Sequence, residues 1–131
     1  MANCTDVPEF TNLEEAALAA ICDLYPQIGD EIRNLVATAR SVERDNTGHG
    51  FFTSFEIDRT NSAITWPYRF VDGPTCEIQV GDQVLIMGFI LWLEAGFPNC
   101  LEGFQFGTKS GGEIDLKQED LASLVFLSPV L

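Results

Sequence analysis

The stretch VLIMGFILWLEAGFPNCLEGFQF, residues 84–106, decides the fold of this chain. Its first ten residues carry no charge and are rich in Ile, Leu, Phe and Trp, and the run ends at Glu94 and a turn-forming Ala-Gly-Phe-Pro. Such a run fits a β-strand buried on both faces, because a membrane span needs about 20 apolar residues. A core helix would tolerate Gly88 poorly and would show a polar face. We therefore predict a central β-hairpin.

Side chains alternate between the two sides of each strand of this hairpin. One side of the first strand holds Val84, Ile86, Ile90 and Trp92, and the other holds Leu85, Met87, Phe89, Leu91 and Leu93. On the return strand, residues 99–105, one side holds Cys100, Glu102, Phe104 and the following Phe106, and the other holds Leu101, Gly103 and Gln105. Both sides of the hairpin need cover from the rest of the chain.

The N-terminal third of the chain offers two short amphipathic helices. Thr11 or Asn12 can cap the first helix, which should end near Tyr25. Pro26 cannot continue that helix, but it can open a second one. Apolar residues recur at helical spacing in both segments, so each helix has one face that can pack on a sheet.

The rest of the chain is typical of strands and turns. Residues 51–58 alternate cleanly between apolar and polar side chains, residues 76–80 do the same, and 41–45 and 125–127 are weaker strand candidates. Residues 72–74 should form a turn, and residues 114–124 should hold a short helix capped by Asp115. We predict one α+β domain over residues 1–131, with two N-terminal helices packed on an antiparallel sheet of about five or six strands.

Charge limits the classes of partner. The chain of 131 residues has 20 acidic and 7 basic residues and a net charge of −13, which disfavours direct binding to nucleic acid or to an anionic membrane. With 46% hydrophobic residues, it is too apolar for a disordered acidic segment. The first ten residues, MANCTDVPEF, lack the basic and apolar regions of a secretory signal, so we expect a cytoplasmic protein.

Cysteine and histidine give no sign of a metal or cofactor site. The cysteines Cys4, Cys22, Cys76 and Cys100 form no CxxC pair, and we expect the last three to be reduced and mostly buried. His49 is the only histidine, so a His-rich metal site is excluded, and a Cys-His catalytic pair would have to form in a glycine loop. The GTKSGG loop at residues 107–112 lacks the Walker order and reads as a solvated loop. No cofactor is predicted.

Glu102 is the best candidate for acid or base chemistry, because it lies within an apolar stretch and burial could raise its pKa. The simpler interpretation is an edge carboxylate that points to water or is held by Arg33, Arg40, Arg44 or Arg69. Glu102 together with the His49 loop defines the alternative function, a small enzyme or ligand-binding protein.

Three segments carry a resemblance. They are GHGFFTSF at residues 48–55, GFILWLEAG at residues 88–96 and NCLEGFQFG at residues 99–107. They resemble stretches of a group of small bacterial proteins of unassigned function, so they imply a shared structure and no activity. In size and acidity alone, the chain is similar to immunity proteins that neutralise bacterial toxins.

These observations favour a non-enzymatic binding protein. A strongly acidic surface suits a basic protein partner, such as a toxin or nuclease domain, because complementary charge accelerates association. A homodimer is also expected, since two short helices can cover only one side of the strand at residues 84–93. The segment from Trp66 to Phe70 is the remaining candidate for covering the other side within one molecule.

Overall fold

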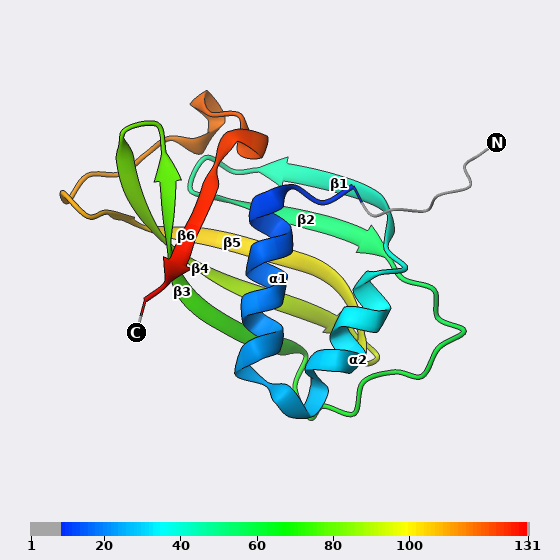
Figure 1. Cartoon of the computed structure of the whole chain (residues 1–131). Helices are drawn as coiled ribbons and strands as arrows, with labels where there is room; N and C mark the ends of the chain where they lie inside the picture. Colours follow the sequence, from blue (N-terminus) through cyan, green and yellow to red (C-terminus); the bar gives the residue numbers. More distant parts are fainter. Residues whose placement is uncertain (1–8, 131) are drawn as a thin grey trace.

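The computed structural model describes residues 9–130 and shows two helices followed by a six-stranded antiparallel sheet (Figure 1). The helices are α1 (Asn12–Leu24) and α2 (Pro26–Val36). The strands are β1 (Arg40–Asn46), β2 (Gly50–Glu56), β3 (Phe70–Val80), β4 (Gln83–Glu94), β5 (Phe97–Thr108) and β6 (Val125–Pro129). They are arranged in the order β1-β2-β5-β4-β3-β6. The predicted α+β fold is confirmed.

The helix ends follow from local capping chemistry. The Thr11 hydroxyl accepts a hydrogen bond from the Glu14 N–H at 3.1 Å, and the Glu14 carboxylate accepts one from the Thr11 N–H at 2.8 Å. This reciprocal pair is a capping box, which satisfies two backbone donors at the start of α1. Tyr25 ends α1, and Pro26 occupies the first turn of α2, where its missing N–H is not needed.

Strands β4 and β5 form the predicted hairpin at the centre of the sheet. The turn between them has only two residues, Ala95 and Gly96, with φ angles of 52° and 83°. Two successive positive φ values match the twist of the flanking strands, which allows so tight a connection. The return strand is therefore longer than the sequence predicted, because it already begins at Phe97.

The side of the sheet that α1 and α2 cover, which we call the covered face, holds the core (Figure 1). Helix α1 contacts β3, β4 and β6, and α2 contacts β5. The sheet residues that point to the helices are almost fully buried. They include Phe51, Phe55, Val71, Ile78, Leu85, Met87, Phe89, Leu91 and Leu101. The clean alternation of residues 51–57 is confirmed, with the even-numbered side chains exposed.

One carboxylate is buried on the covered face. Glu14 is 1% exposed, and its oxygens accept hydrogen bonds from Arg44 at 2.6 and 2.8 Å, from the Thr53 hydroxyl and from the Thr11 N–H. Burial by itself would raise the pKa of Glu14, but these hydrogen bonds and the charge of Arg44 outweigh burial and lower it. Glu14 therefore joins α1 to β1 and β2 as a fully paired anion.

Two local predictions are wrong. Gly73 and Pro74 were expected in a turn but lie inside β3, where the register with β4 shifts between Asp72 and Thr75. A Cβ added at Gly73 would lie 2.7 Å from the Phe89 carbonyl oxygen, so this position of the strand requires glycine.

Residues 114–124 form two separate 3-10 turns, Leu116–Gln118 and Leu121–Ser123, instead of one helix. Asp115 caps the first turn, as expected, through the Lys117 N–H. Asp120 caps the second turn through the Ala122 N–H. A capping residue has a non-helical backbone conformation, so a cap at Asp120 begins a new turn and interrupts the hydrogen bonds of a continuous helix.

Candidate functional site

The side of the sheet that points away from both helices, which we call the open face, is not covered as the sequence led us to expect. Its residues on β4 are only half-buried: Val84, Ile86, Ile90 and Trp92. The Trp66 ring instead packs 5.3 Å from the Tyr25 ring at the junction of the helices, and only Phe70 reaches Trp92, at 5.6 Å. The prediction of a strand buried on both faces is therefore wrong, because the helices within residues 9–130 cover one side only.

One row across the open face alternates carboxylates with apolar side chains. The strand registers place Phe52 between Asp45 and Glu102, and Ile90 between Glu102 and Asp72. Directly opposite residues point to the same side of a sheet, so these five side chains, which we call the acidic row, share the open face. Since neighbouring strands lie about 4.8 Å apart, successive carboxylates of the row are roughly 10 Å apart.

Glu102, the carboxylate singled out from the sequence, is the middle member of the acidic row. It is half-buried and accepts a hydrogen bond from the indole N–H of Trp92, with 3.0 Å between Nε1 and Oε1. In residues 9–130 it forms no ion pair with any of the four arginines expected to hold it. Asp45 and Asp72 are exposed, and within the same residues they form no ion pair. The row therefore presents carboxylates that a partner can engage.

A second part of the open face, toward the β3–β4 turn, is apolar. We call it the neutral patch, and its members are Val84, Ile86, Phe104, Phe106 and Val125. Phe106 is 64% exposed and Val125 is 53% exposed. The two charged residues nearest in the strand register, Glu77 opposite Ile86 and Lys109 beyond the end of β5, pair with each other at 3.0 Å.

Gly88 shapes the neutral patch by having no side chain. The rings of Phe104 and Phe106 meet edge to face, with centroids 5.3 Å apart. A Cβ added at Gly88 would lie 2.6 Å from the tip of the Phe104 ring and 3.2 Å from the Phe106 ring. Both rings therefore lean across β4 into the space that glycine leaves.

The second candidate, His49, lies away from the acidic row. Its side chain is 83% exposed in the loop between β1 and β2, and its Nδ1 is 3.8 Å from a carboxylate oxygen of Glu113. A hollow of about 510 Å³ opens beside it and is lined by Thr47, Gly48, His49, Glu113, Ile114, Asp115 and Lys117. Glu102 does not line this hollow. The structure thus does not bring Glu102 and His49 together there.

The cysteines in residues 9–130 are free thiols. Cys22 and Cys76 are buried and Cys100 is half-buried, while Cys4 lies outside the described residues. Burial raises the pKa of Cys76 to about 11. Burial also raises the pKa of Cys100, as does the charge of Glu102, whereas a hydrogen bond from Ser54 acts in the opposite direction. Protonated thiols are weak nucleophiles, so these groups are poorly suited to covalent catalysis.

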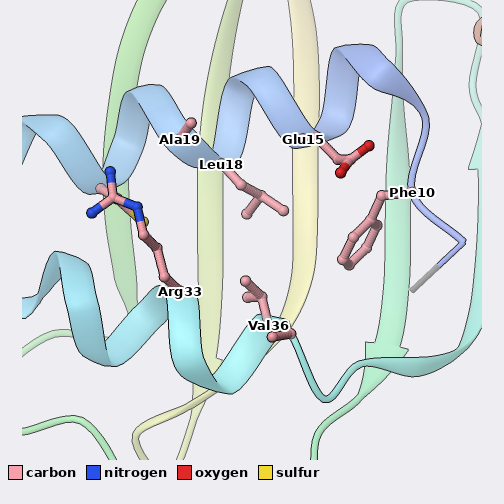
Figure 2. Close-up of a pocket in the computed structure, with 8 residues that line it drawn as sticks. Phe10, Glu15, Leu18, Ala19, Arg33 and Val36 are labelled. Carbon is pink, nitrogen blue, oxygen red and sulfur yellow. The ribbon is translucent and has the colours of Figure 1, made fainter. Parts of the chain in front are cut away.

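A hollow of about 300 Å³ lies between the two helices on the other side of the molecule (Figure 2). Leu18 and Val36 face each other across it, and Arg33 and Glu15 lie toward its two ends. The Arg33 guanidinium is already engaged by Asp23 at 2.7 Å. Ligand sites combine an apolar wall with converging free polar groups, and this hollow has the wall without them.

No protein-family model, curated protein or solved structure matches this chain. The resemblance to small bacterial proteins therefore stays a prediction. None of the helices in residues 9–130 has the length and apolar character required to cross a membrane. The same residues contain no group of three or more His, Cys, Asp and Glu side chains placed to hold a metal ion.

Sequence reasoning found Glu102 but missed its neighbours in the acidic row. Asp45 and Asp72 each lie in a short polar segment, where an exposed acid is unremarkable. Only the strand pairings align them with Glu102 on β5, which Asp45 reaches through Phe52 of β2 and Asp72 through Ile90 of β4. What distinguishes these two acids is the apolar residue that lies opposite each of them on the adjacent strand. This neighbour cannot be identified from the sequence until the strand register is known.

Proposed function

We propose that this chain is a non-enzymatic, cytoplasmic protein-binding domain that takes a basic protein on the acidic row of the open face. The observation that carries the proposal is the alternation of carboxylates and apolar side chains across five strands. Apolar contacts between such charges exclude water and strengthen the ion pairs that a basic partner forms. An immunity- or inhibitor-like role, in which the domain covers the basic site of a toxin or nuclease, is the specific form of the proposal.

The net charge of −13 supports the same class of partner. A negative surface attracts a positive one over a distance of about 8 Å at physiological salt, and this attraction raises the rate of association. Arg44 on the covered face and Lys109 beside the neutral patch are both neutralised within the chain, by Glu14 and Glu77. The carboxylates of the acidic row, in contrast, form no ion pair within residues 9–130, so their charge can attract a basic partner.

Affinity capture from the source cells tests the proposal with two matched variants. The first variant removes the three charges of the acidic row by Asp45→Asn, Glu102→Gln and Asp72→Asn. The control removes three exposed charges elsewhere by Glu15→Gln, Glu31→Gln and Asp82→Asn, so both proteins have the same net charge. Equal charge separates binding at the row from nonspecific attraction.

We expect the wild type and the control to retain a basic protein that is released as salt rises, and the acidic-row variant to lose it at all salt concentrations. The captured protein is then purified, and its affinity is measured by calorimetry against all three proteins. Equal affinity for the two variants would overturn the assignment to the acidic row. A partner with an acidic surface would overturn the proposed class.

A further inference from the structure

The neutral patch is separate from the acidic row and fits a different occupant. Glu102 and Phe104 are two residues apart on β5, so the row and the first ring of the patch are about 7 Å apart along the strand. The patch exposes aromatic and aliphatic side chains, and the two charges nearest to it in the strand register cancel in the Glu77–Lys109 pair, with Asp82 lying beyond it in the β3–β4 turn. We infer that the neutral patch binds a second copy of this chain across a two-fold axis.

Electrostatics favours a second copy at the patch over the acidic row. A chain with a charge of −13 repels its own copy, so self-association needs a contact region that is free of net charge. None of the five side chains of the patch is charged, whereas the acidic row places three carboxylates against whatever docks there. The same apolar side chains meet each other in an isologous contact, and apolar surfaces are complementary to themselves.

The charge pattern also selects the orientation of the axis. Two stacked sheets can be related by an axis along the strands or by one that crosses them. An axis along the strands would place the two acidic rows face to face. An axis across the strands at the level of Ile86 reverses the strand direction, and because Ile86 and Ile90 are four residues apart, it separates the rows by roughly 26 Å. This distance exceeds the screening length of about 8 Å, so the second arrangement avoids the repulsion.

The exposed area indicates a weak dimer. A fully exposed Phe side chain presents roughly 200 Å², so with Phe106 64% and Val125 53% exposed, the five side chains leave on the order of 350 Å² open in each copy. Two copies would bury about 700 Å² from these side chains, and the rim of the contact adds more. The area from these side chains is below the roughly 1,200 Å² of a stable specific interface, so the dimer should be weak and should exchange with monomer at tens to hundreds of micromolar.

Sedimentation equilibrium from about 5 to about 500 µM tests the inference on the full chain with two matched serine variants. Phe106→Ser removes the most exposed ring of the patch. Leu24→Ser removes a side chain of similar exposure, 52%, at the end of α1 on the helical side. Both positions are exposed, so both variants should fold, and circular dichroism checks this. We expect the wild type and Leu24→Ser to reach the dimer mass, and Phe106→Ser to weaken dimerisation at least tenfold.

The outcomes separate this inference from the proposed function. A monomer at every concentration, or equal loss in both serine variants, would overturn the dimer. The acidic-row triple variant should change the dimer constant by less than about twofold, and a tenfold tighter dimer in that variant would overturn the axis across the strands. Added salt should leave the dimer intact while it releases a basic partner, so either proposal can fail while the other stands.

Discussion

The two faces of the sheet differ in how completely their side chains are buried and hydrogen-bonded within one molecule. On the covered face, Leu91 is fully buried, and the buried carboxylate of Glu14 has every oxygen paired. On the open face, the adjacent residue Ile90 is only half-buried, and Glu102 has one described hydrogen bond, from Trp92. The covered face is complete within one molecule. The open face keeps apolar surface and charge in contact with water, which a folding argument alone does not explain.

Removal of the Glu14 side chain should produce the largest effect. Glu14→Ala leaves Arg44 and the buried Thr53 hydroxyl without their acceptor, and it also removes the capping box of α1. Breaking one side of a buried ion pair costs about 3–5 kcal/mol. We expect urea unfolding to show a loss of this size, whereas Glu102→Ala changes stability far less. Similar losses for the two variants would mean that the two faces are equally closed.

The second prediction compares neighbours on β4. Leu91→Ala opens a cavity in the core and should lower the free energy of unfolding by about 2–4 kcal/mol. Ile90→Ala removes a side chain that water already reaches in part, so a smaller loss of about 1–2 kcal/mol is expected in dilute protein. Chemical denaturation of both variants at low micromolar concentration checks the contrast. If Ile90→Ala were as damaging as Leu91→Ala, something would have to cover the open face.

Acid should weaken the covered face through Glu14. Its pKa is lowered in the folded state, so its contribution to stability is fully present above the pKa of the unfolded chain, about 4.3. That contribution is lost as pH falls through the lower folded value, because protons then bind the unfolded state more readily. Thermal melts from pH 6 down to pH 2 should show a fall below pH ~4 that is reduced in Glu14→Gln. An identical acid profile in Glu14→Gln would assign the fall to other carboxylates.

The parts of the fold that the sequence predicted depend on local chemistry. Thr11 and Glu14, within four residues of each other, indicate where the first helix begins, and Pro26 indicates the break between the two helices. The alternation at residues 51–57 fixes which side of β2 is buried before any partner strand is known. Such signals lie within a few residues of one another, so single-sequence reasoning reaches them.

The parts that it missed depend on contacts between distant residues. Gly73 and Pro74 have turn composition, but tertiary packing against Phe89 keeps them in a strand. The acidic row joins five strands whose registers no local pattern specifies, so only Glu102, an acid inside an apolar run, stood out.

Gly88→Val probes the packing of the neutral patch on the open face and should lower stability by about 1 kcal/mol. The new side chain would meet the Phe104 ring at 2.6 Å, but that ring lies on the open face and can turn outward. A gain in strand propensity offsets part of the strain. Thermal melting of Gly88→Val, with and without Phe104→Ala, measures the effect, and the second substitution should restore the loss. A higher melting temperature in Gly88→Val would contradict the close packing of the rings.

The smallest effect is expected at Glu102, and it sharpens the comparison most. Glu102→Gln keeps the shape of the side chain and its hydrogen bond from Trp92, so the free energy of unfolding should change by less than about 0.5 kcal/mol. The same substitution removes the central charge of the acidic row, which a basic partner would contact together with Phe52 and Ile90. Urea unfolding measures stability, and calorimetry with the captured partner measures affinity. A carboxylate retained for folding would show the loss in the first measurement. A carboxylate retained for binding leaves stability unchanged and shows the loss only in the second, which is the result that the open face leads us to expect.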